Sequence, residues 1–291
     1  MRILTYRVRE QDAGKRVEQV LLGPLQISHG LLSRLKRRAN GICVNGQRMY
    51  STSILKAGDV VTADVGDGGP PRNLEPVEMD LSILFEDEDL LVLDKPADVP
   101  VHPTKDPGER NLEQGLFAYL SGGAYPHFVS RLDKGTTGLM LVAKSGYIHE
   151  RMKRQLHTEG FFREYMAVAD GFVTPPSGTI REPIGLADGS SYRHCVRPDG
   201  AKSVTVYETI SAAKGRTLLR LLPQTGRTHQ LRVHMAYLGY PLTGDWLYGT
   251  RCEEIDRPAL HSCGLTFVHP VTGDRLTFHS PMPPDMDQLL I

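Results

Sequence analysis

Hydrophobic and polar residues alternate with a two-residue period at the start of the chain, as in a β-strand with one buried face. Apolar segments predict further strands at 81–103, with an acidic turn at Glu86–Asp89, at 139–145, which is a candidate for a buried strand, and at 164–171, 203–210 and 216–226. In the same later part of the chain, helical spacing predicts a helix at about 146–157 and another near 229–239. Strands without a regular strand–helix–strand repeat favour an α+β fold.

The first 65 residues have a different pattern. Apolar residues recur at helical spacing over 17–25 and 31–35. The segment GICVNGQRM predicts a β-hairpin, because Asn45-Gly46 suits a tight turn in which both residues have positive φ. Residues 55–65, LKAGDVVTADV, then predict a turn that leads into a strand. We expect a small α/β unit here.

A break between two domains is predicted at GDGGPP, residues 66–71, because glycine and proline interrupt regular structure. We therefore expect a small domain at 1–68, a linker at 69–80 and a large domain at 81–291. A chain of 291 residues is long enough for two such domains.

Composition adds expectations about location. No run of about 18 apolar residues is present, and the first residues lack the apolar core of a signal peptide, so we expect neither a membrane span nor secretion. Cys43, Cys195, Cys252 and Cys263 lie far apart and form no CxxC pair, which indicates reduced thiols without a zinc site or disulfide framework. We expect a cytoplasmic monomer.

The net charge is zero, but its distribution is uneven. Residues 1–70 carry 11 Lys and Arg against 6 Asp and Glu, whereas residues 71–100 carry 2 against 9. The basic excess includes Arg34, Lys36, Arg37 and Arg38 at one end of an expected helix. Such a cluster is suited to phosphate contacts, although most charge runs are simply solvated helix faces.

The basic helical segment SRLKRR, followed by the VNG hairpin and a GD turn, resembles the S-four-type RNA-binding domain, named after a ribosomal protein. The resemblance covers about 55 residues and its motifs are moderately specific. It favours the RNA-contact interpretation of the basic cluster over the solvated face.

Four further motifs follow in order: LVLDKPADVPVHP, SRLDKGTTGL, FFREYMAVADG and LLPQTGRTHQLRVHMAYLGYPLTGDWLYG. Each motif alone is a weak signal. Together, over most of residues 80–280, they closely resemble the RluA family of RNA pseudouridine synthases. The resemblance implies a mixed, largely antiparallel sheet with a central cleft. It also implies isomerisation of uridine to pseudouridine within RNA, by breakage of the glycosidic bond and its re-formation to carbon 5.

The same resemblance implies roles for individual residues. The essential aspartate of the family falls on Asp133, its nucleotide-displacing arginine on Arg131 and its active-site tyrosine on Tyr165. Arg227 matches the basic residue that pairs with the aspartate. Ser130 stands where the family usually has the histidine of HRLD, but the essential aspartate of the motif is present.

These residue types suit the chemistry. Cleavage of the bond between ribose and base makes the sugar electron-poor, and a carboxylate can stabilise or attack that centre. A guanidinium beside Asp133 favours the ionised carboxylate in a dried site. Arg131 and Asp133 share a face if their segment is extended, and the following glycines and threonines are expected to bring the backbone close to the ribose. Tyr165 by pattern alone fits a core strand equally well.

The remaining polar residues receive lesser assignments. We expect His229 and Arg232 to contact RNA, and His229 and His234 to orient a loop or touch phosphate. The two histidines lie five residues apart and do not share a helix face, so no metal site is expected. Trp246 is expected to pack in the interior. No cofactor is expected, and RNA is the expected partner.

Two other classes of protein remain to be weighed. A non-catalytic RNA-binding factor for ribosome assembly could keep the fold without the chemistry, but Asp133, Arg131, Tyr165 and Arg227 are all present. A glycoside hydrolase needs a second carboxylate as general acid, and no Asp or Glu near these motifs is an obvious candidate. The sequence therefore favours the enzyme, on ribosomal rather than transfer RNA, but does not identify the uridine.

Overall fold

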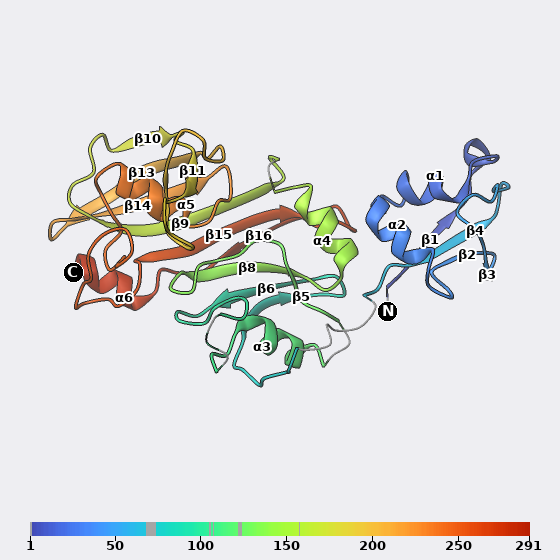
Figure 1. The fold of residues 1–291 in the computed structure, drawn as a ribbon, viewed down its shortest axis with the longest axis horizontal. Helices are drawn as coiled ribbons and strands as arrows, with labels where there is room; N and C mark the ends of the chain where they lie inside the picture. The colour runs from blue at the N-terminus through green and yellow to red at the C-terminus, as the bar shows by residue number, and fades with distance from the viewer. Residues whose placement is uncertain (1, 68–73, 105, 107, 122–123, 157) are drawn as a thin grey trace.

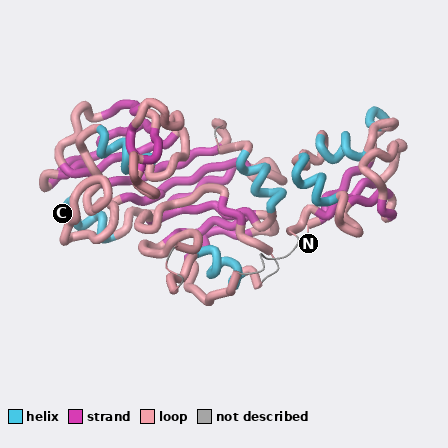
Figure 2. Tube along the Cα trace, viewed as in Figure 1, coloured by secondary structure: helices cyan, strands magenta, loops and turns pink. Residues whose placement is uncertain are grey.

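The computed structural model describes residues 2–67, 74–104, 106, 108–121, 124–156 and 158–291. The GDGGPP break and the predicted linker at 69–80 lie partly outside these described residues. Strands dominate the architecture and helices are few and short, as Figure 2 shows. The α+β expectation is confirmed.

The N-terminal unit is a four-stranded antiparallel sheet in the order β1-β4-β2-β3, with helices packed on it. Its elements are β1 (Ile3–Arg7), η1 (Glu10–Asp12), α1 (Val17–Leu22), α2 (His29–Leu35), β2 (Ile42–Val44), β3 (Gln47–Arg48) and β4 (Val60–Asp64). Leucine and valine side chains of α1 and α2 are buried against β4. Asn45 and Gly46 have φ values of 52° and 80°, so the predicted hairpin turn is confirmed.

The large unit is built on a ten-stranded sheet whose main path runs β10-β13-β14-β9-β15-β8-β6-β5. Its strands are β5 (Ser82–Glu86), β6 (Leu90–Lys95), β7 (His127–Phe128), β8 (Thr137–Ala143), β9 (Phe161–Asp170), β10 (Ser177–Ile180), β13 (Thr205–Ala213), β14 (Arg216–Pro223), β15 (Leu260–Val268) and β16 (Arg275–His279). All pairings within it are antiparallel except that of β15 with β8. The prediction of a largely antiparallel sheet is therefore confirmed.

The remaining elements cover the sheet and its ends (Figure 1). They are α3 (Leu112–Tyr119), α4 (Gly146–Lys153), the hairpin β11 (Ile184–Leu186) with β12 (His194–Val196), α5 (Gln230–Tyr237), α6 (Pro284–Asp287) and η2 (Gln288–Leu290). The predicted helices at 146–157 and 229–239 are thus present but shorter than expected.

Strand β8 lies at the centre of the large unit, and all seven of its residues are buried. Alternate residues face two different cores: Leu139 and Leu141 face one, and Met140 and Val142 face the other. Gly138 has φ 106°, and a Cβ there would lie 2.3 Å from the Ser262 carbonyl oxygen. The glycine therefore permits close approach of β8 to β15 directly after the loop that carries Asp133.

The N-terminal unit lies beside α4 at one end of the large sheet (Figure 1). The Tyr147 hydroxyl donates to the Leu25 carbonyl over 3.0 Å, and Arg2 forms ion pairs with Glu88 and Asp89. Asp67, just before the undescribed part of the connection, accepts a hydrogen bond from the Gly146 amide (3.1 Å) and lies 2.8 Å from His127 Nε2. Polar contacts therefore join the two units on both sides of α4.

Candidate active site

Asp133 lies in a loop between β7 and β8, directly before the central strand. The segment is not extended; the Thr136 amide donates to the Asp133 carbonyl in a turn (3.1 Å). Leu132 is nevertheless buried in the core, while Arg131 and Asp133 both line one cavity. The two residues therefore border the same cavity, but the extended segment on which the predicted shared face depended is not present.

The loop that carries Asp133 is fixed by Lys95, at the end of β6. The Lys95 ammonium is fully buried and donates to the carbonyls of Pro96 (2.7 Å), Val99 (2.9 Å) and Lys134 (2.8 Å). Burial lowers the pKa of Lys95 to about 7, against the opposing effect of Asp98 and Asp133. Lys95 thus ties the residue after Asp133 to the neighbouring loop.

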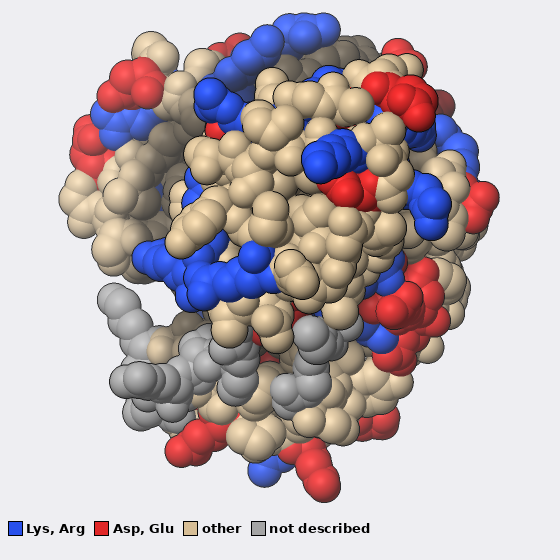
Figure 3. All heavy atoms as spheres, turned by 90° about the vertical axis from the view of Figure 1, so that its right-hand side faces the viewer, with Lys and Arg blue, Asp and Glu red and all other residues tan. Residues whose placement is uncertain are grey.

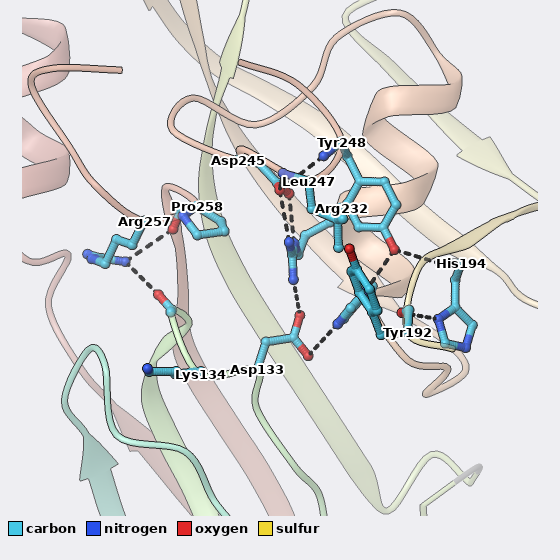
Figure 4. Close-up of polar contacts among 12 residues, drawn as sticks. Asp133, Lys134, Tyr192, His194, Arg232, Asp245, Leu247, Tyr248, Arg257 and Pro258 are labelled. Atoms are coloured by element: carbon cyan, nitrogen blue, oxygen red, sulfur yellow. Dashed lines mark hydrogen bonds and ion pairs between the residues drawn. The ribbon is translucent and has the colours of Figure 1, made fainter. Parts of the chain in front are cut away.

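Arg232 of α5 is the partner of Asp133. Its Nη1 lies 3.0 Å from Asp133 Oδ2, and its Nε and Nη2 donate to Asp245 over 2.7 and 2.8 Å (Figure 4). Burial works against the guanidinium charge, but the hydrogen bonds that Arg232 donates to Asp245 and the charges of both carboxylates raise the pKa of Arg232 overall. A fixed cation therefore stands beside Asp133.

The prediction that Arg227 pairs with Asp133 is wrong, because Arg232, which was expected to contact RNA, is the arginine that binds this carboxylate. Arg227 lies in the exposed loop before α5, where its Nε donates to the Lys202 carbonyl over 3.2 Å. Arg232 is only 6% exposed. The physical reason is the helix: Arg232, inside α5, is directed at the buried Asp245, whereas Arg227 precedes the helix at the rim of the cavity.

The loop that carries Arg227 and His229 is held by the buried side chain of Gln230. Its Oε1 accepts from the Thr225 hydroxyl (2.7 Å) and the Arg227 amide (3.0 Å), and its Nε2 donates to the Val204 carbonyl and to Thr205 Oγ1 (both 3.0 Å). All four polar positions of the amide are used. The loop is thereby pre-shaped at the cavity wall.

His229 faces Asp133 from this loop. Its Nε2 lies 4.0 Å from Asp133 Oδ1, and its Nδ1 is 2.8 Å from the Tyr248 hydroxyl. Burial lowers the pKa of His229, against the opposing charge of Asp133. His234, in contrast, is buried with hydrogen bonds to Thr205 and to the Glu182 carbonyl, so its predicted phosphate contact is wrong and its role is structural.

Tyr165 of β9 lies in the cavity wall and also belongs to the hydrophobic core, so the two sequence interpretations of this residue are compatible. Burial raises the pKa of its hydroxyl, and the negative charge of Asp133 acts in the same direction. The phenol therefore stays protonated at neutral pH, in the wall of the cavity that also contains Asp133.

The cavity measures about 690 Å³, within the roughly 300–1,000 Å³ usual for small-molecule sites. Among the described residues that line it, Asp133 is the single carboxylate, whereas cationic side chains come from several elements: Arg131, Lys153, Arg163, Arg227 and Arg232. A cationic wall around one carboxylate suits a polyanionic ligand with one reacting centre. The predicted central cleft corresponds to this cavity.

Several residues that build the site carry no prediction from the sequence. Asp245 and Tyr248 lie in GDWLYG, where only Trp246 has an expected role, and Trp246 is 52% exposed although it was expected to pack. Lys95 lies in the motif LVLDKPADVPVHP without an expected role, and Arg257 donates to the Gly135 carbonyl (3.3 Å). The lysine that follows an apolar run was an available signal, because burial of an ammonium requires several acceptors.

The basic cluster of the N-terminal unit is only partly free. Arg34, Lys36 and Arg37 are exposed, with Lys36 Nζ 3.6 Å from Glu18, whereas Arg38 donates to the carbonyls of Asp64 (3.1 Å) and Gly66 (2.6 Å). Arg38 thus holds the end of β4, a structural role that the sequence did not indicate. Figure 3 views the molecule from this side and shows Lys and Arg in several groups with acidic groups between some of them.

Two further findings concern membrane-spanning helices and metal-binding clusters. Within the described ranges, no helix is long and apolar enough to cross a membrane. The same residues contain no group of three or more His, Cys, Asp or Glu placed to hold a metal ion.

A largely antiparallel sheet with one carboxylate in a cationic cleft suits an enzyme that acts on a polyanionic substrate, and comparison with known proteins gives the family. Residues 89–237 match the family described as RNA pseudouridylate synthase. The chain is 38% identical to the Bacillus subtilis protein named uncharacterized RNA pseudouridine synthase YjbO, over 92% of this chain and 96% of that one. It is 37% identical to ribosomal large subunit pseudouridine synthase D of Vibrio cholerae, over 99% of this chain and 94% of that one.

Among solved structures, human RNA pseudouridylate synthase domain containing 1 superimposes with a TM-score of 0.59 at 26% identity, over 75% of this chain and 89% of that one. This protein therefore belongs to the RluA-type RNA pseudouridine synthases, enzymes that isomerise uridine to pseudouridine in RNA. Family and reaction are as the sequence motifs predicted.

Proposed function

We propose that this enzyme modifies uridine in large-subunit ribosomal RNA, using Asp133 as the catalytic carboxylate. The similarity to relatives named ribosomal large subunit pseudouridine synthase D extends over 97% or more of this chain in several species, which includes the N-terminal unit. The observation that carries the site assignment is the hydrogen bond of Arg232 to Asp133 Oδ2, in a cavity where Oδ1 lies 4.0 Å from His229 Nε2.

Each cavity residue has a part in the proposed reaction. The target nucleotide leaves its stack and enters the cavity, where Arg131 at the exposed edge fills the vacated place or holds the adjoining phosphate. Tyr165 lies against the uracil, and its protonated hydroxyl is available for proton transfer. Asp133 meets the electron-poor anomeric carbon, while Arg232 keeps the carboxylate ionised and oriented. Arg227, at the rim, contacts the RNA backbone.

We further propose that residues 1–68 are an S-four-type RNA-binding domain, that 69–80 is a linker, and that 81–291 is the catalytic domain. The separate four-stranded sheet and the exposed side chains of Arg34, Lys36 and Arg37 support this division. An enzyme of this kind acts on RNA as a cytoplasmic monomer; the four free cysteines fit a reducing compartment.

Pseudouridine mapping tests both parts of the proposal. Total RNA from a deletion strain should lack a pseudouridine in large-subunit ribosomal RNA, and the purified enzyme should restore it. Asp133→Asn keeps the shape of the side chain but removes its charge, so it should bind the RNA with similar affinity and release no tritium from carbon-5-labelled uridine. Substantial turnover by Asp133→Asn would refute the catalytic assignment, and a missing site in transfer RNA alone would refute the substrate.

A further inference from the structure

The His229 ring is held in one tautomer by a chain of hydrogen bonds. The Tyr248 hydroxyl accepts a hydrogen bond from the backbone N–H of His194 (3.0 Å) and lies 2.8 Å from His229 Nδ1. Among the described residues, His229 Nδ1 is the acceptor within reach of the phenol proton, so Tyr248 donates to it. Because burial lowers the pKa of His229, the ring is neutral at pH 7, and its one proton is on Nε2.

The backbone of His229 is in an uncommon conformation. Its φ and ψ are 55° and 18°, in the left-handed region that non-glycine residues rarely adopt, directly before the first turn of α5. The hydrogen bonds of Gln230 and Tyr248 keep the loop and the ring in place despite this conformation. Such strain is retained where the direction of a side chain matters, and here it directs Nε2–H towards Asp133.

The distance between the His229 ring and the Asp133 carboxylate leaves room for one bridging atom. His229 Nε2 and Asp133 Oδ1 are 4.0 Å apart, too far for a direct hydrogen bond. One hydroxyl oxygen about 2.8 Å from each atom fits between them. Oδ2 of Asp133 is already bound by Arg232, so Oδ1 is the oxygen left to meet the ribose. A hydroxyl group adjacent to the reacting carbon is therefore the expected occupant of the gap.

We propose that His229 is a ribose-selecting residue, whose Nε2–H donates to the 2′-hydroxyl of the target nucleotide while that hydroxyl donates to Asp133 Oδ1. This inference rests on the proposed approach of Asp133 to the anomeric carbon, because C2′ is bonded to that carbon. The 2′-hydroxyl both donates and accepts, and it is the group by which a protein distinguishes RNA from DNA at a given position. The substrate class at this subsite is a ribonucleotide rather than a deoxyribonucleotide.

The test is a cycle of two enzymes and two substrates. An RNA fragment that contains the mapped target is prepared with uridine or 2′-deoxyuridine at that position alone, and single-turnover rates are measured with the wild type and with His229→Gly. Glycine adopts positive φ freely, so this variant removes the ring and leaves the loop unstrained. We expect His229→Gly to be about 10- to 100-fold slower on uridine, and to be within about threefold of the wild type on 2′-deoxyuridine.

An equal penalty on both substrates would overturn the proposal, because the ring would then act on the protein or through a bound water and not on the 2′-hydroxyl. His229→Asn, which also tolerates positive φ, repeats the test with a shorter polar side chain. Tyr248→Phe removes the donor that fixes the tautomer, and it should reduce the preference for uridine partially, by less than tenfold.

The same cycle measured as Kd in the Asp133→Asn background gives a second readout that needs no turnover. In that background the enzyme with His229 should bind the uridine RNA more tightly than the 2′-deoxyuridine RNA, and the His229→Gly enzyme should bind both equally. The same ratio of Kd values in the two enzymes would also overturn the proposal. Failure of the overall function is distinguished by the wild type alone, which in that case forms no pseudouridine on the uridine fragment.

Discussion

The guanidinium of Arg232 is shared by two carboxylates: Nη1 is 3.0 Å from Asp133 Oδ2, and Nε and Nη2 bind Asp245, which is fully buried. One cation thus connects the proposed catalytic group to the interior of the protein. Because Asp245 fixes the guanidinium in two places, the position of the Asp133 carboxylate depends on a residue that does not line the cavity.

We predict that Arg232→Gln and Arg227→Ala behave differently. Loss of Arg232 leaves Asp245 buried without its cation, which should lower the free energy of unfolding by about 3–5 kcal/mol and abolish isomerisation. Arg227→Ala should change that free energy by no more than about 0.5 kcal/mol and mainly weaken RNA binding. Urea unfolding and single-turnover rates measure both effects.

Arg232→Lys is the matched control, because lysine keeps the charge but cannot make the two parallel hydrogen bonds to Asp245. It should recover part of the stability and little of the rate. Similar losses of stability in Arg227→Ala and Arg232→Gln would contradict the arrangement described above.

We predict that Tyr165→Phe retains fold and RNA affinity but loses about 10²–10⁴ in rate, the usual contribution of a positioned proton donor or acceptor. The ring remains to pack in the core and lie against the base, and only the hydroxyl is removed. Single-turnover rates and a binding titration separate the two roles. Full activity would reduce Tyr165 to a packing surface for the base.

We predict that the basic residues of the N-terminal unit have two different functions, RNA binding and stabilisation of the fold. Arg34→Gln and Arg37→Gln remove exposed cations, so each should reduce the slope of log affinity against log salt by about 0.7–0.9 if it neutralises one phosphate. Arg38→Gln should instead lower the melting temperature, because two carbonyls near the end of β4 lose their donor. A stability loss for Arg34→Gln without a change in slope would contradict this division.

Stability should decrease on mild acidification. Burial lowers the pKa of four histidines, His149, His229, His234 and His261. Below about pH 6.5 the unfolded chain protonates these groups and the folded protein does not, so the unfolded state binds more protons and is favoured. The stability that comes from keeping these histidines neutral is fully present above pH 6.5. It is lost progressively as the pH falls from there through their lowered pKa values.

Urea unfolding at pH 7.5 and 5.5 measures this dependence. Partial burial would raise the pKa values of Asp67 and Glu113, but hydrogen bonds to His127 and His102 respectively lower them overall. These two carboxylates begin to lose their contribution to the free energy of unfolding only nearer pH 4. His149→Gln should reduce the difference between the two pH values. Equal stability at both would show that the histidines are not held neutral by the fold.

The sequence by itself determined the class of fold and several of its strands and helices, and it pointed to the proposed catalytic carboxylate. Runs of consecutive apolar residues were enough to locate β6 and β8, because a short run of this kind is typical of a strand buried on both faces. Asn45-Gly46 determines its own turn through local sterics. Asp133 could be proposed from the sequence because the motif SRLDKGTTGL resembles that of a known family, in which the aspartate is essential.

The tertiary structure alone decided which charges meet. Asp133 and Arg232 are 99 residues apart, and Arg227 is an equally good cation in the sequence. The choice between them depends on the burial of Asp245 and on the position of each arginine relative to α5. Lys95 likewise finds its acceptors only where the loops at 96–99 and 134 come together. Local periodicity depends on neighbouring residues, whereas ion pairs depend on distances between segments that only the completed fold brings together.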